Sequence, residues 1–472
     1  MTLQSPDELR GRAAEGEDRE ATMSQSSAPD RSTAAPTPPP APRPRPSEAA
    51  SPATSPTADA ATPAVAPAGH RRNKVLHTLS LMGPAFIVGA WQFGPGNLVS
   101  AVQAGSRFYY SLIWVIALST VLMLMFADMS IRVGISSRGS VVETIKETLG
   151  RATGVAAGLG VFTITLMFSV GNAVGSGLGL SLVLGGNPVW WTLACTALVA
   201  AILFARQAYK VIEKIVLAIV ATMAVSFIAT AIITRPDWGD AAAGLLPTVP
   251  TGVGLLLVAL VGTNFSLNAA FYAGYASRER GLRREQYRET TLADTIPGIV
   301  APGVMTALVI AAAAAVLGGT GGQEGATIAQ FSGVLEPLAG EVGRTIFALG
   351  FTGAALSAMI ANATAGGTLL SDGLGWGNRV SSGRVRLGIL GVLAFGATVT
   401  VLAQGTSPVQ LIIVAQALTV IVAPMLGVLL VILANNHRLM GDLRNRWWQN
   451  VVAAVGLVAI LATCYQLVVT TF

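Results

Sequence analysis

Apolar residues occur along the chain in long stretches that are separated by short polar segments. From Val75 onward, eleven of these stretches have a length close to the about 20 residues with which a helix crosses a hydrocarbon core of about 30 Å. We number them span 1 to span 11, and the pattern predicts an all-α polytopic membrane protein with eleven transmembrane helices. Their approximate limits are 79–105, 111–133, 153–180, 189–206, 211–233, 251–276, 296–318, 343–371, 385–403, 408–434 and 448–470.

Lysine and arginine are concentrated in alternate connections between the spans. The positive-inside rule places such basic connections in the cytoplasm. The first basic run stands before span 1, so we expect a plasma-membrane protein with a cytoplasmic N-terminus. An odd number of spans then places the C-terminus outside the cytoplasm. The basic segments are 71–74, 132–151, 206–214, 278–285, 379–386 and 437–446.

The composition agrees with a membrane protein and excludes several other classes. Of the 472 residues, 52% are hydrophobic and 11% are charged, which is more apolar surface than a soluble core needs. The formal charge of +6 does not indicate nucleic-acid binding, because the basic residues lie in short runs between the spans. Cys195 and Cys464 lie inside apolar spans, so neither a disulfide framework nor a metal cluster is expected. The sequence shows no pair of nucleophile and base and no ATP-binding loop, so we expect neither an enzyme nor a bound cofactor.

The first 74 residues have a different composition from the rest of the chain. Segments such as "APTPPPAPRPRPSEAASPATSP" are rich in Pro, Ala and Ser, and such sequences bury too little apolar surface to offset the entropy lost on ordering. Residues 1–74 are therefore predicted to be a disordered cytoplasmic tail that lacks the apolar core of a secretory signal. Residues 75–472 form the predicted transmembrane domain.

Two spans are interrupted near their middle by residues that disfavour a continuous helix. Span 1 contains Gly94-Pro95-Gly96-Asn97, and span 6 contains GTNFSLN at 262–268. Proline lacks a backbone N–H and glycine adopts dihedral angles that other residues avoid. The breaks are five spans apart, as expected for an inverted repeat of spans 1–5 and 6–10 followed by an eleventh helix. Unwound backbone at membrane depth is buried or lines a cavity, which predicts a binding site between the breaks, although close helix packing is an alternative reason for the glycines.

Three segments resemble the Nramp family of divalent-metal transporters. The first, "GPAFIVGAWQFGPGNLVSAVQAGSRFYYSLIWV", is similar to the family signature Asp-Pro-Gly-Asn followed by Gln-Ala-Gly and Trp-Val. The other two are "FALGFTGAALSAMIANATAGGTLLSDGLG" in span 8 and "LIIVAQALTVIVAPMLGVLLVILANNHRLMGDLRN" from span 10 onward. The resemblance covers essentially 75–472. It implies a LeuT-type fold, which is a 5+5 inverted repeat plus one helix with helices 1 and 6 broken.

The resemblance also implies which residues form the metal site and where this chain departs from the family. Asn97 matches the signature asparagine that coordinates the metal, whereas Gly94 stands in place of the signature aspartate. Ser266 replaces a methionine of span 6, and Asn268 replaces a histidine that the family links to proton movement. Gln416 matches a glutamine of span 10 that joins the coordination shell when the site closes. The implied metal site consists of Asn97, Gly94, Thr263, Ser266, Gln416, Asn264 and Asn268.

These departures remove charge and sulfur from the implied site. Where span 3 of the family has an acidic pair for protons, this chain has Ser169 and Asn172. A site of hydroxyl, amide and carbonyl oxygens lacks the preference of a thioether for transition metals, and Mg²⁺ usually keeps several of its waters. We therefore predict a secondary transporter or uniporter of divalent cations, with Mg²⁺ preferred and Mn²⁺ a poorer substrate. Proton coupling is not expected, because no ionisable group is predicted near the site.

Two other functions remain open. The glycine-rich break of span 1 would also suit a neutral or anionic organic solute held by the amides at a helix end. A non-transporting scaffold or sensor with an Nramp-like domain would keep the fold without any flux. Apart from the lipid bilayer and the small cation, no partner is expected, and the sequence does not fix the oligomeric state.

Other acidic residues are expected to lie away from the site. Asp128 lies four residues before Arg132, and the two side chains are expected to pair near the end of span 2. Asp372 and Asp294 lie at the inner ends of spans 8 and 7, where a gate or a solvated cap is expected.

Overall fold

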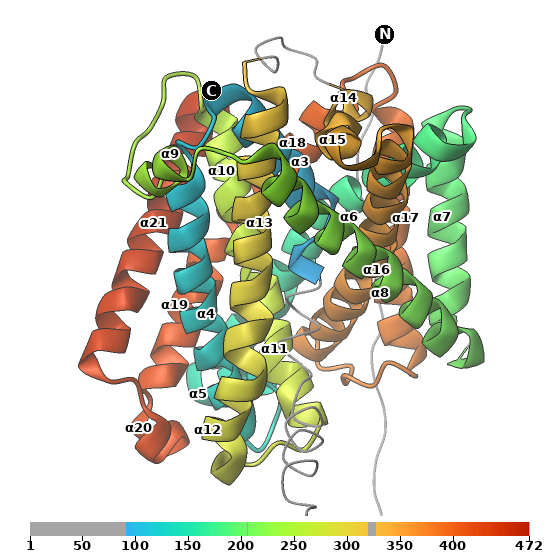
Figure 1. Cartoon of the computed structure of the whole chain (residues 1–472). Helices are drawn as coiled ribbons and strands as arrows, with labels where there is room; N and C mark the ends of the chain where they lie inside the picture. The colour runs from blue at the N-terminus through green and yellow to red at the C-terminus, as the bar shows by residue number, and fades with distance from the viewer. Residues whose placement is uncertain (1–90, 205, 320–326, 472) are drawn as a thin grey trace, which may run out of the picture. The chain divides into compact units, whose positions relative to one another are not determined.

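The computed structural model describes residues 91–204, 206–319 and 327–471, and these form helices joined by short connections, with no strand among them (Figure 1). The predicted tail and the first part of span 1 lie outside the described residues. The structure confirms the all-α fold. The helices are α3 (Pro95–Phe108), α4 (Ile113–Ser136), α5 (Val141–Leu149), α6 (Arg151–Leu184), α7 (Pro188–Phe204), α8 (Arg206–Thr234), α9 (Trp238–Ala243), α10 (Gly254–Asn264), α11 (Leu267–Glu279), α12 (Tyr287–Thr290), α13 (Ile296–Leu317), α14 (Ile328–Ser332), α15 (Glu336–Ala339), α16 (Glu341–Gly373), α17 (Gly383–Leu402), α18 (Pro408–Leu418), α19 (Ala423–Asn435), α20 (His437–Met440) and α21 (Trp447–Thr471).

The helices follow the predicted spans closely. Among the described residues, seven helical segments are long and apolar enough to cross a membrane, and the bent pair α18 and α19 makes an eighth. α7 and the segment Ala218–Thr234 of α8 are shorter apolar helices. Each predicted span from the second onward coincides with one of these segments. The total of eleven stays a prediction, because span 1 begins outside the described part of the chain.

Both predicted breaks are present. α3 begins at Pro95, and Gly94 before it has extended backbone angles, with φ −80° and ψ 177°. Proline suits the first position of a helix, where the missing N–H would have no helical partner. In span 6, α10 and α11 are separated by Phe265 and Ser266, neither of which is helical. Spans 1 and 6 therefore both place irregular backbone inside the bundle.

Span 10 contains a break that the sequence analysis did not predict. α18 and α19 meet at an angle of 41° and are joined by a 3-10 turn, Thr419–Ile421. Pro424 stands in the first turn of α19. Its missing N–H interrupts the ladder of helical hydrogen bonds, which is the physical reason for the bend.

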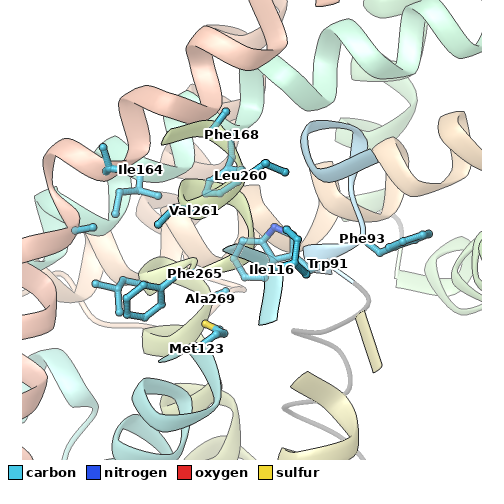
Figure 2. Close-up of a cluster of buried hydrophobic side chains, with 14 of the residues drawn as sticks. Trp91, Phe93, Ile116, Met123, Ile164, Phe168, Leu260, Val261, Phe265 and Ala269 are labelled. Atoms are coloured by element: carbon cyan, nitrogen blue, oxygen red, sulfur yellow. The ribbon is translucent and has the colours of Figure 1, made fainter. Parts of the chain in front are cut away.

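A cluster of buried apolar side chains surrounds the break in span 6 (Figure 2). The ring of Phe265 is 3% exposed and meets the ring of Phe126 of α4 edge to face, with centroids 5.1 Å apart. Trp91 packs in the same manner against Tyr272 of α11, at 6.0 Å. Burying one such side chain contributes about 1.5–3 kcal/mol. Apolar packing on α4 thus holds Phe265 at the break of span 6, and packing on α11 holds Trp91 just before the break of span 1.

The outer face of α21 carries apolar side chains that are left exposed. Val451, Val455, Val458 and Leu461 recur every three or four residues and therefore lie on one face of the helix. An uncovered apolar stripe of this length is unfavourable in water and favourable against acyl chains. This face indicates that α21 lies at the lipid boundary of the bundle.

Candidate functional site

A small cavity lies where the two broken spans meet α6 and α18. Its volume is about 10 Å³, roughly the room that one water molecule needs. Five of the seven predicted site residues line it, namely Gly94, Asn97, Thr263, Ser266 and Gln416. The other lining residues are Trp91, Gln92, Gly96, Phe168, Asn172 and Ala269.

Asn97 presents to this cavity an amide oxygen that has no hydrogen-bond partner. The residue is 2% exposed, and its Nδ2 donates to Thr306 Oγ1 of α13 at 2.9 Å and to the backbone oxygen of Gln92 at 3.1 Å. These two bonds fix the amide, whereas Oδ1 accepts none. A buried polar atom without a partner costs about 1–3 kcal/mol. The unused oxygen therefore indicates a place for a ligand or an ordered water.

The amide of Gln416 lies in a slot between two glycines. Gln416 is fully buried, and neither its Oε1 nor its Nε2 has a hydrogen-bond partner. A Cβ atom at Gly96 would lie 2.5 Å from Nε2 and 2.7 Å from Cγ of Gln416. A Cβ atom at Gly171 of α6 would overlap Nε2 from the other side. Glycine at both positions is thus what leaves room for this amide at the cavity.

Thr263 and Ser266 line the cavity, and the hydroxyl proton of each is donated in a hydrogen bond to another protein atom. Thr263 Oγ1 donates to the backbone oxygen of Ala259 at 2.9 Å, one turn earlier in α10. Ser266 Oγ donates to Asn268 Oδ1 at 2.5 Å. Because each proton points away to a protein acceptor, the lone pairs of both oxygens remain available to a ligand.

The other two predicted site residues, Asn264 and Asn268, do not line the cavity. Asn264 Nδ2 is directed toward α4, where the hydroxyl oxygens of Ser119 and Thr120 both accept at 2.9 Å. Asn268 Nδ2 donates to Asn362 Oδ1 of α16 at 3.3 Å. This geometry gives both residues a positioning role at the break of span 6. Binding of a cation by any of the seven residues stays a prediction.

A neutral hydrogen-bonded chain leads from the edge of the cavity to α6. It runs from Ser266 through Asn268 to Asn362, whose Nδ2 donates to the backbone oxygen of Thr165 at 2.7 Å. Each link is a hydroxyl, an amide or a backbone carbonyl. None of these groups gains or loses a proton near neutral pH, so the chain orders the site without providing an ionisable group.

Gln92, which was not predicted from the sequence, connects the two broken spans. Gln92 Nε2 donates to the backbone oxygen of Asn264 at 3.0 Å, and the side chain is 6% exposed. An isolated amide in an apolar span, two residues before the glycine-proline break, was the available signal. The apolar residues of the cavity wall are Trp91, Phe168 and Ala269. They could not be recognised in the sequence, because apolar residues fill every span.

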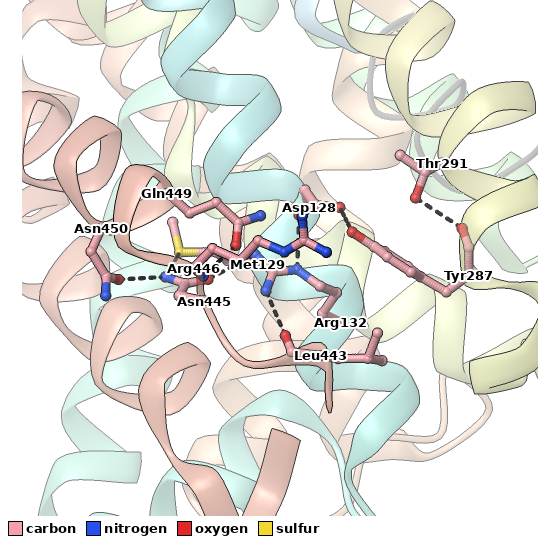
Figure 3. Close-up of polar contacts among 10 residues, drawn as sticks. All are labelled: Asp128, Met129, Arg132, Tyr287, Thr291, Leu443, Asn445, Arg446, Gln449 and Asn450. Carbon is pink, nitrogen blue, oxygen red and sulfur yellow. Dashed lines mark hydrogen bonds and ion pairs between the residues drawn. The ribbon is translucent and has the colours of Figure 1, made fainter. Parts of the chain in front are cut away.

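No ionisable side chain lines the cavity in the described part of the chain. Among the side chains that the structure describes, in residues 91–204, 218–319 and 327–470, no three His, Cys, Asp or Glu are grouped so that they could hold a metal ion. The buried ion pair of Asp128 and Arg132 lies apart from the cavity, further along α4 (Figure 3). Arg132 Nε lies 2.8 Å from Asp128 Oδ2, which confirms the pairing that the sequence analysis expected.

The ion pair of Asp128 and Arg132 connects three parts of the chain (Figure 3). Arg132 Nη1 donates to the backbone oxygen of Leu443 at 2.7 Å, and its Nη2 donates to Asn445 Oδ1 at 2.8 Å. Tyr287 of α12 donates its hydroxyl to the second carboxylate oxygen of Asp128 at 2.7 Å. The network therefore joins α4, α12 and the connection between α20 and α21.

An all-helical membrane protein whose broken spans enclose a small polar cavity has the architecture of a transporter with discontinuous helices. In these proteins half-helix ends and unwound backbone form the binding site, and in this chain the non-helical backbone at Gly94 and Ser266 borders the cavity. The chain belongs to the Nramp family, since the family model described as "Natural resistance-associated macrophage protein-like" matches residues 85–470.

Relatives similar over most of their length carry transporter names. The divalent metal cation transporter MntH of Klebsiella pneumoniae (strain 342) is 28% identical over 400 residues, which are 82% of this chain and 92% of the relative. The protein of the same name from Verminephrobacter eiseniae is 26% identical over 412 residues, which are 85% of this chain and 92% of the relative.

Two solved structures resemble the fold. A manganese transporter of Eremococcus coleocola, in complex with an aromatic bis-isothiourea compound, matches with a TM-score of 0.72 at 17% identity. The match covers 86% of this chain and 89% of the transporter. MhsT in complex with L-phenylalanine matches with a TM-score of 0.53 at 14% identity, over 81% of this chain and 98% of MhsT. These likenesses confirm the predicted LeuT-type fold.

Proposed function

We propose that this protein carries a divalent metal cation across the membrane, prefers a hard cation such as Mg²⁺ over Mn²⁺, and moves no protons with it. The observation that carries this proposal is the cavity at the two breaks, where the unpartnered polar atoms of Asn97, Asn172 and Gln416 are all amide atoms. The names of the matched relatives, divalent metal cation transporters, support the class of cargo.

The chemistry of the lining supports a hard cation. The described part of the cavity wall offers amide, hydroxyl and backbone oxygens and contains neither a thioether nor a thiolate. Such oxygens suit Mg²⁺ and Ca²⁺, whereas sulfur ligands select softer metals. Because the described lining carries no formal charge, it offers little to offset the complete dehydration of a divalent ion, and a cation that keeps waters is favoured.

The size of the cavity indicates that it has to widen around such a cargo. By the same measure of volume one water molecule needs about 10–15 Å³, so a cation that keeps several waters needs several times the room that the cavity offers. The cavity of about 10 Å³ is therefore a closed form of the site. Gln416 is the side chain best suited to move, because its amide makes no hydrogen bond to the protein that would be lost.

The absence of ionisable groups from the described lining supports transport without protons. The chain of Ser266, Asn268 and Asn362, which leads away from the cavity, offers neither an acid nor a base for proton transfer. The membrane potential alone is an adequate driving force. A divalent ion gains about 4.6 kcal/mol per 100 mV, which corresponds to an accumulation of about 10³-fold.

The proposal is tested by reconstituting the purified protein in liposomes that contain a Mg²⁺ indicator and a pH indicator. We expect saturable Mg²⁺ uptake that requires an inside-negative potential and leaves the internal pH unchanged. Asn97→Ala is expected to reduce uptake at least about tenfold, since it removes the unpartnered oxygen. Ser169→Ala is the control, because the Ser169 hydroxyl bonds to Leu166 in its own helix and does not line the cavity. Acidification in step with Mg²⁺ entry would contradict proton-independent transport.

Ser266→Met is expected to shift the preference of the site toward Mn²⁺. The substitution adds a thioether sulfur, a ligand that favours transition metals, at a position that lines the cavity. The measurement is the ratio of Mn²⁺ to Mg²⁺ uptake in a competition assay. Ser266→Leu supplies a side chain of similar size without sulfur, so an equal shift in both variants would show that size, and not sulfur, sets the preference.

We further propose that the end of the bundle with α5, α12 and α20 faces the cytoplasm of a cell whose plasma membrane holds the protein. Arg278 donates to the backbone oxygen of Ser137 at 2.7 Å, and Arg284 donates to that of Leu439 at 2.7 Å. These contacts bring three basic connections together at one end (Figure 1). The positive-inside rule favours the cytoplasm for such an end.

A small organic solute is the second candidate cargo, because two of the unpartnered atoms are N–H donors. Asn172 Nδ2 and Gln416 Nε2 would suit a carboxylate or a carbonyl oxygen. Uptake of labelled amino acids or organic acids into the same liposomes, without any flux of a divalent metal, would favour this cargo. An intact protein without flux of either kind would favour a scaffold or sensor.

A further inference from the structure

Asn172 of α6 is a cavity residue whose amide nitrogen has no hydrogen-bond partner among the described residues. It is 3% exposed and lines the cavity between Phe168 and the broken end of span 1. Buried amides are normally satisfied, and an unsatisfied one at a cavity indicates that a bound species completes its hydrogen bonds.

The position of this amide relative to Gly94 is the second observation. A Cβ atom built on Gly94 would lie 3.5 Å from Asn172 Oδ1 and 3.3 Å from Cβ of Ala358. The separation from Oδ1 is an ordinary contact, whereas Cβ of Ala358 would have to move by a few tenths of an ångström. With that small shift, a side chain could begin at Gly94 and would reach the amide of Asn172. The space beside Gly94 is thus bordered by a polar group that comes from a different helix.

We propose that Asn172 of α6 is a cargo-binding residue. Gly94 of span 1 has no side chain, and Asn172 supplies a polar contact to the cargo in its place. This inference rests on the proposed function, since it assigns a ligand group to the same cation. The amide oxygen is a neutral oxygen ligand for the cation or for one of its waters. Because Nδ2 has no hydrogen-bond partner among the described residues, the amide can turn its oxygen toward the cargo without losing a hydrogen bond at Nδ2.

The neighbouring polar residue of α6 does not share this arrangement. Ser169 lies three residues before Asn172 and is also buried, but its hydroxyl donates to the backbone oxygen of Leu166 at 2.7 Å. Ser169 does not line the cavity. A polar side chain on this part of α6 therefore does not by itself line the cavity or leave a polar atom unpartnered. Ser169 thus provides a matched control for Asn172.

The test compares divalent binding to purified full-length protein by calorimetry, with Mg²⁺ and Mn²⁺ as separate probes. Asn172→Asp and Gly94→Asp place a carboxylate at either side of the same space, and each is expected to tighten Mn²⁺ and Mg²⁺ binding at least about tenfold. Asn172→Ala is expected to weaken Mg²⁺ binding at least about tenfold with the thermal unfolding temperature unchanged, and Ser169→Ala to leave Kd unchanged. If Asn172→Asp does not fold, the Kd values of Asn172→Ala and Asn172→Gln still test the proposal.

The outcomes separate this inference from the proposed function. Tighter binding in Gly94→Asp, with Kd unchanged in Asn172→Asp and Asn172→Ala, would overturn the role of Asn172 and leave the proposed cargo standing. If the wild-type protein bound no divalent ion but both aspartate variants gained a Mn²⁺ site, the proposed cargo would fall and the shared position of the two residues would stand. Absence of binding in the wild-type protein and in both folded aspartate variants would overturn both.

Discussion

Replacement of Arg132 by alanine is expected to destabilise the folded protein by about 3–5 kcal/mol, because it leaves a buried charge without its partner. The side chains of Arg132 and Asp128 are 2% and 12% exposed, so water cannot replace the lost guanidinium. The change also removes the donors that reach the backbone oxygen of Leu443 and the side chain of Asn445. Thermal unfolding of the purified protein in detergent, followed by circular dichroism, measures the loss.

Two further variants establish the cause. Arg344→Ala removes an arginine that also pairs with two carboxylates, but its side chain is 42% exposed, and we expect little change in unfolding temperature. Asp128→Asn combined with Arg132→Met leaves no unpaired charge and is expected to be more stable than Arg132→Ala. Equal unfolding temperatures for Arg132→Ala and Arg344→Ala would show that the buried network contributes little to stability.

Gly96→Ala is expected to abolish most transport while leaving the protein folded. The added methyl group would overlap the end of the Gln416 side chain, which is flexible and makes no hydrogen bond to the protein. The overlap is therefore relieved by moving this amide out of the cavity, and not by moving backbone. Loss of one polar contact to a charged cargo lowers affinity by about 10- to 100-fold. Initial rates of Mg²⁺ uptake and the melting temperature are the two measurements.

A double variant distinguishes displacement of Gln416 from a general disturbance of α3. If the methyl group acts through this amide, Gly96→Ala combined with Gln416→Ala transports no worse than Gln416→Ala alone. Gly391→Ala in α17 is the control, because the nearest atom to its added methyl group is Phe162 Cζ at 4.0 Å. A further loss in the double variant would show that Gly96 acts on the site by another route.

The elements of this fold could be predicted from local sequence, since long apolar stretches and the Gly94-Pro95 break act through backbone chemistry within a few residues. The bend of span 10 was missed although Pro424 is present. A single proline in an apolar span is common and does not by itself show whether the helix continues. The same limit applies to Gln92, whose partner is 172 residues away in the sequence.

The orientation of the site residues was the least predictable part. Asn264 and Asn268 lie within two residues of Ser266, yet their side chains bond to α4 and α16 and do not line the cavity. The cause is the non-helical pair Phe265 and Ser266, which changes the direction of successive side chains in a way that no periodic pattern describes. Sequence position therefore identified the neighbourhood of the cavity but not which amides face it.

Gln416 lies at a distance along the helix from the bend between α18 and α19, so a rotation at the bend would displace it. Gln416 stands six positions before Val422, the residue at the bend, and six positions correspond to about 9 Å along a helix axis. A rotation of about 10° at the bend would therefore displace Gln416 by about 1.6 Å. That displacement exceeds the radius of a water molecule, about 1.4 Å. A small rotation at this bend, which lies outside the cavity, would therefore move the Gln416 amide at the cavity wall by more than half the diameter of a water molecule while every helical hydrogen bond of α18 stays intact.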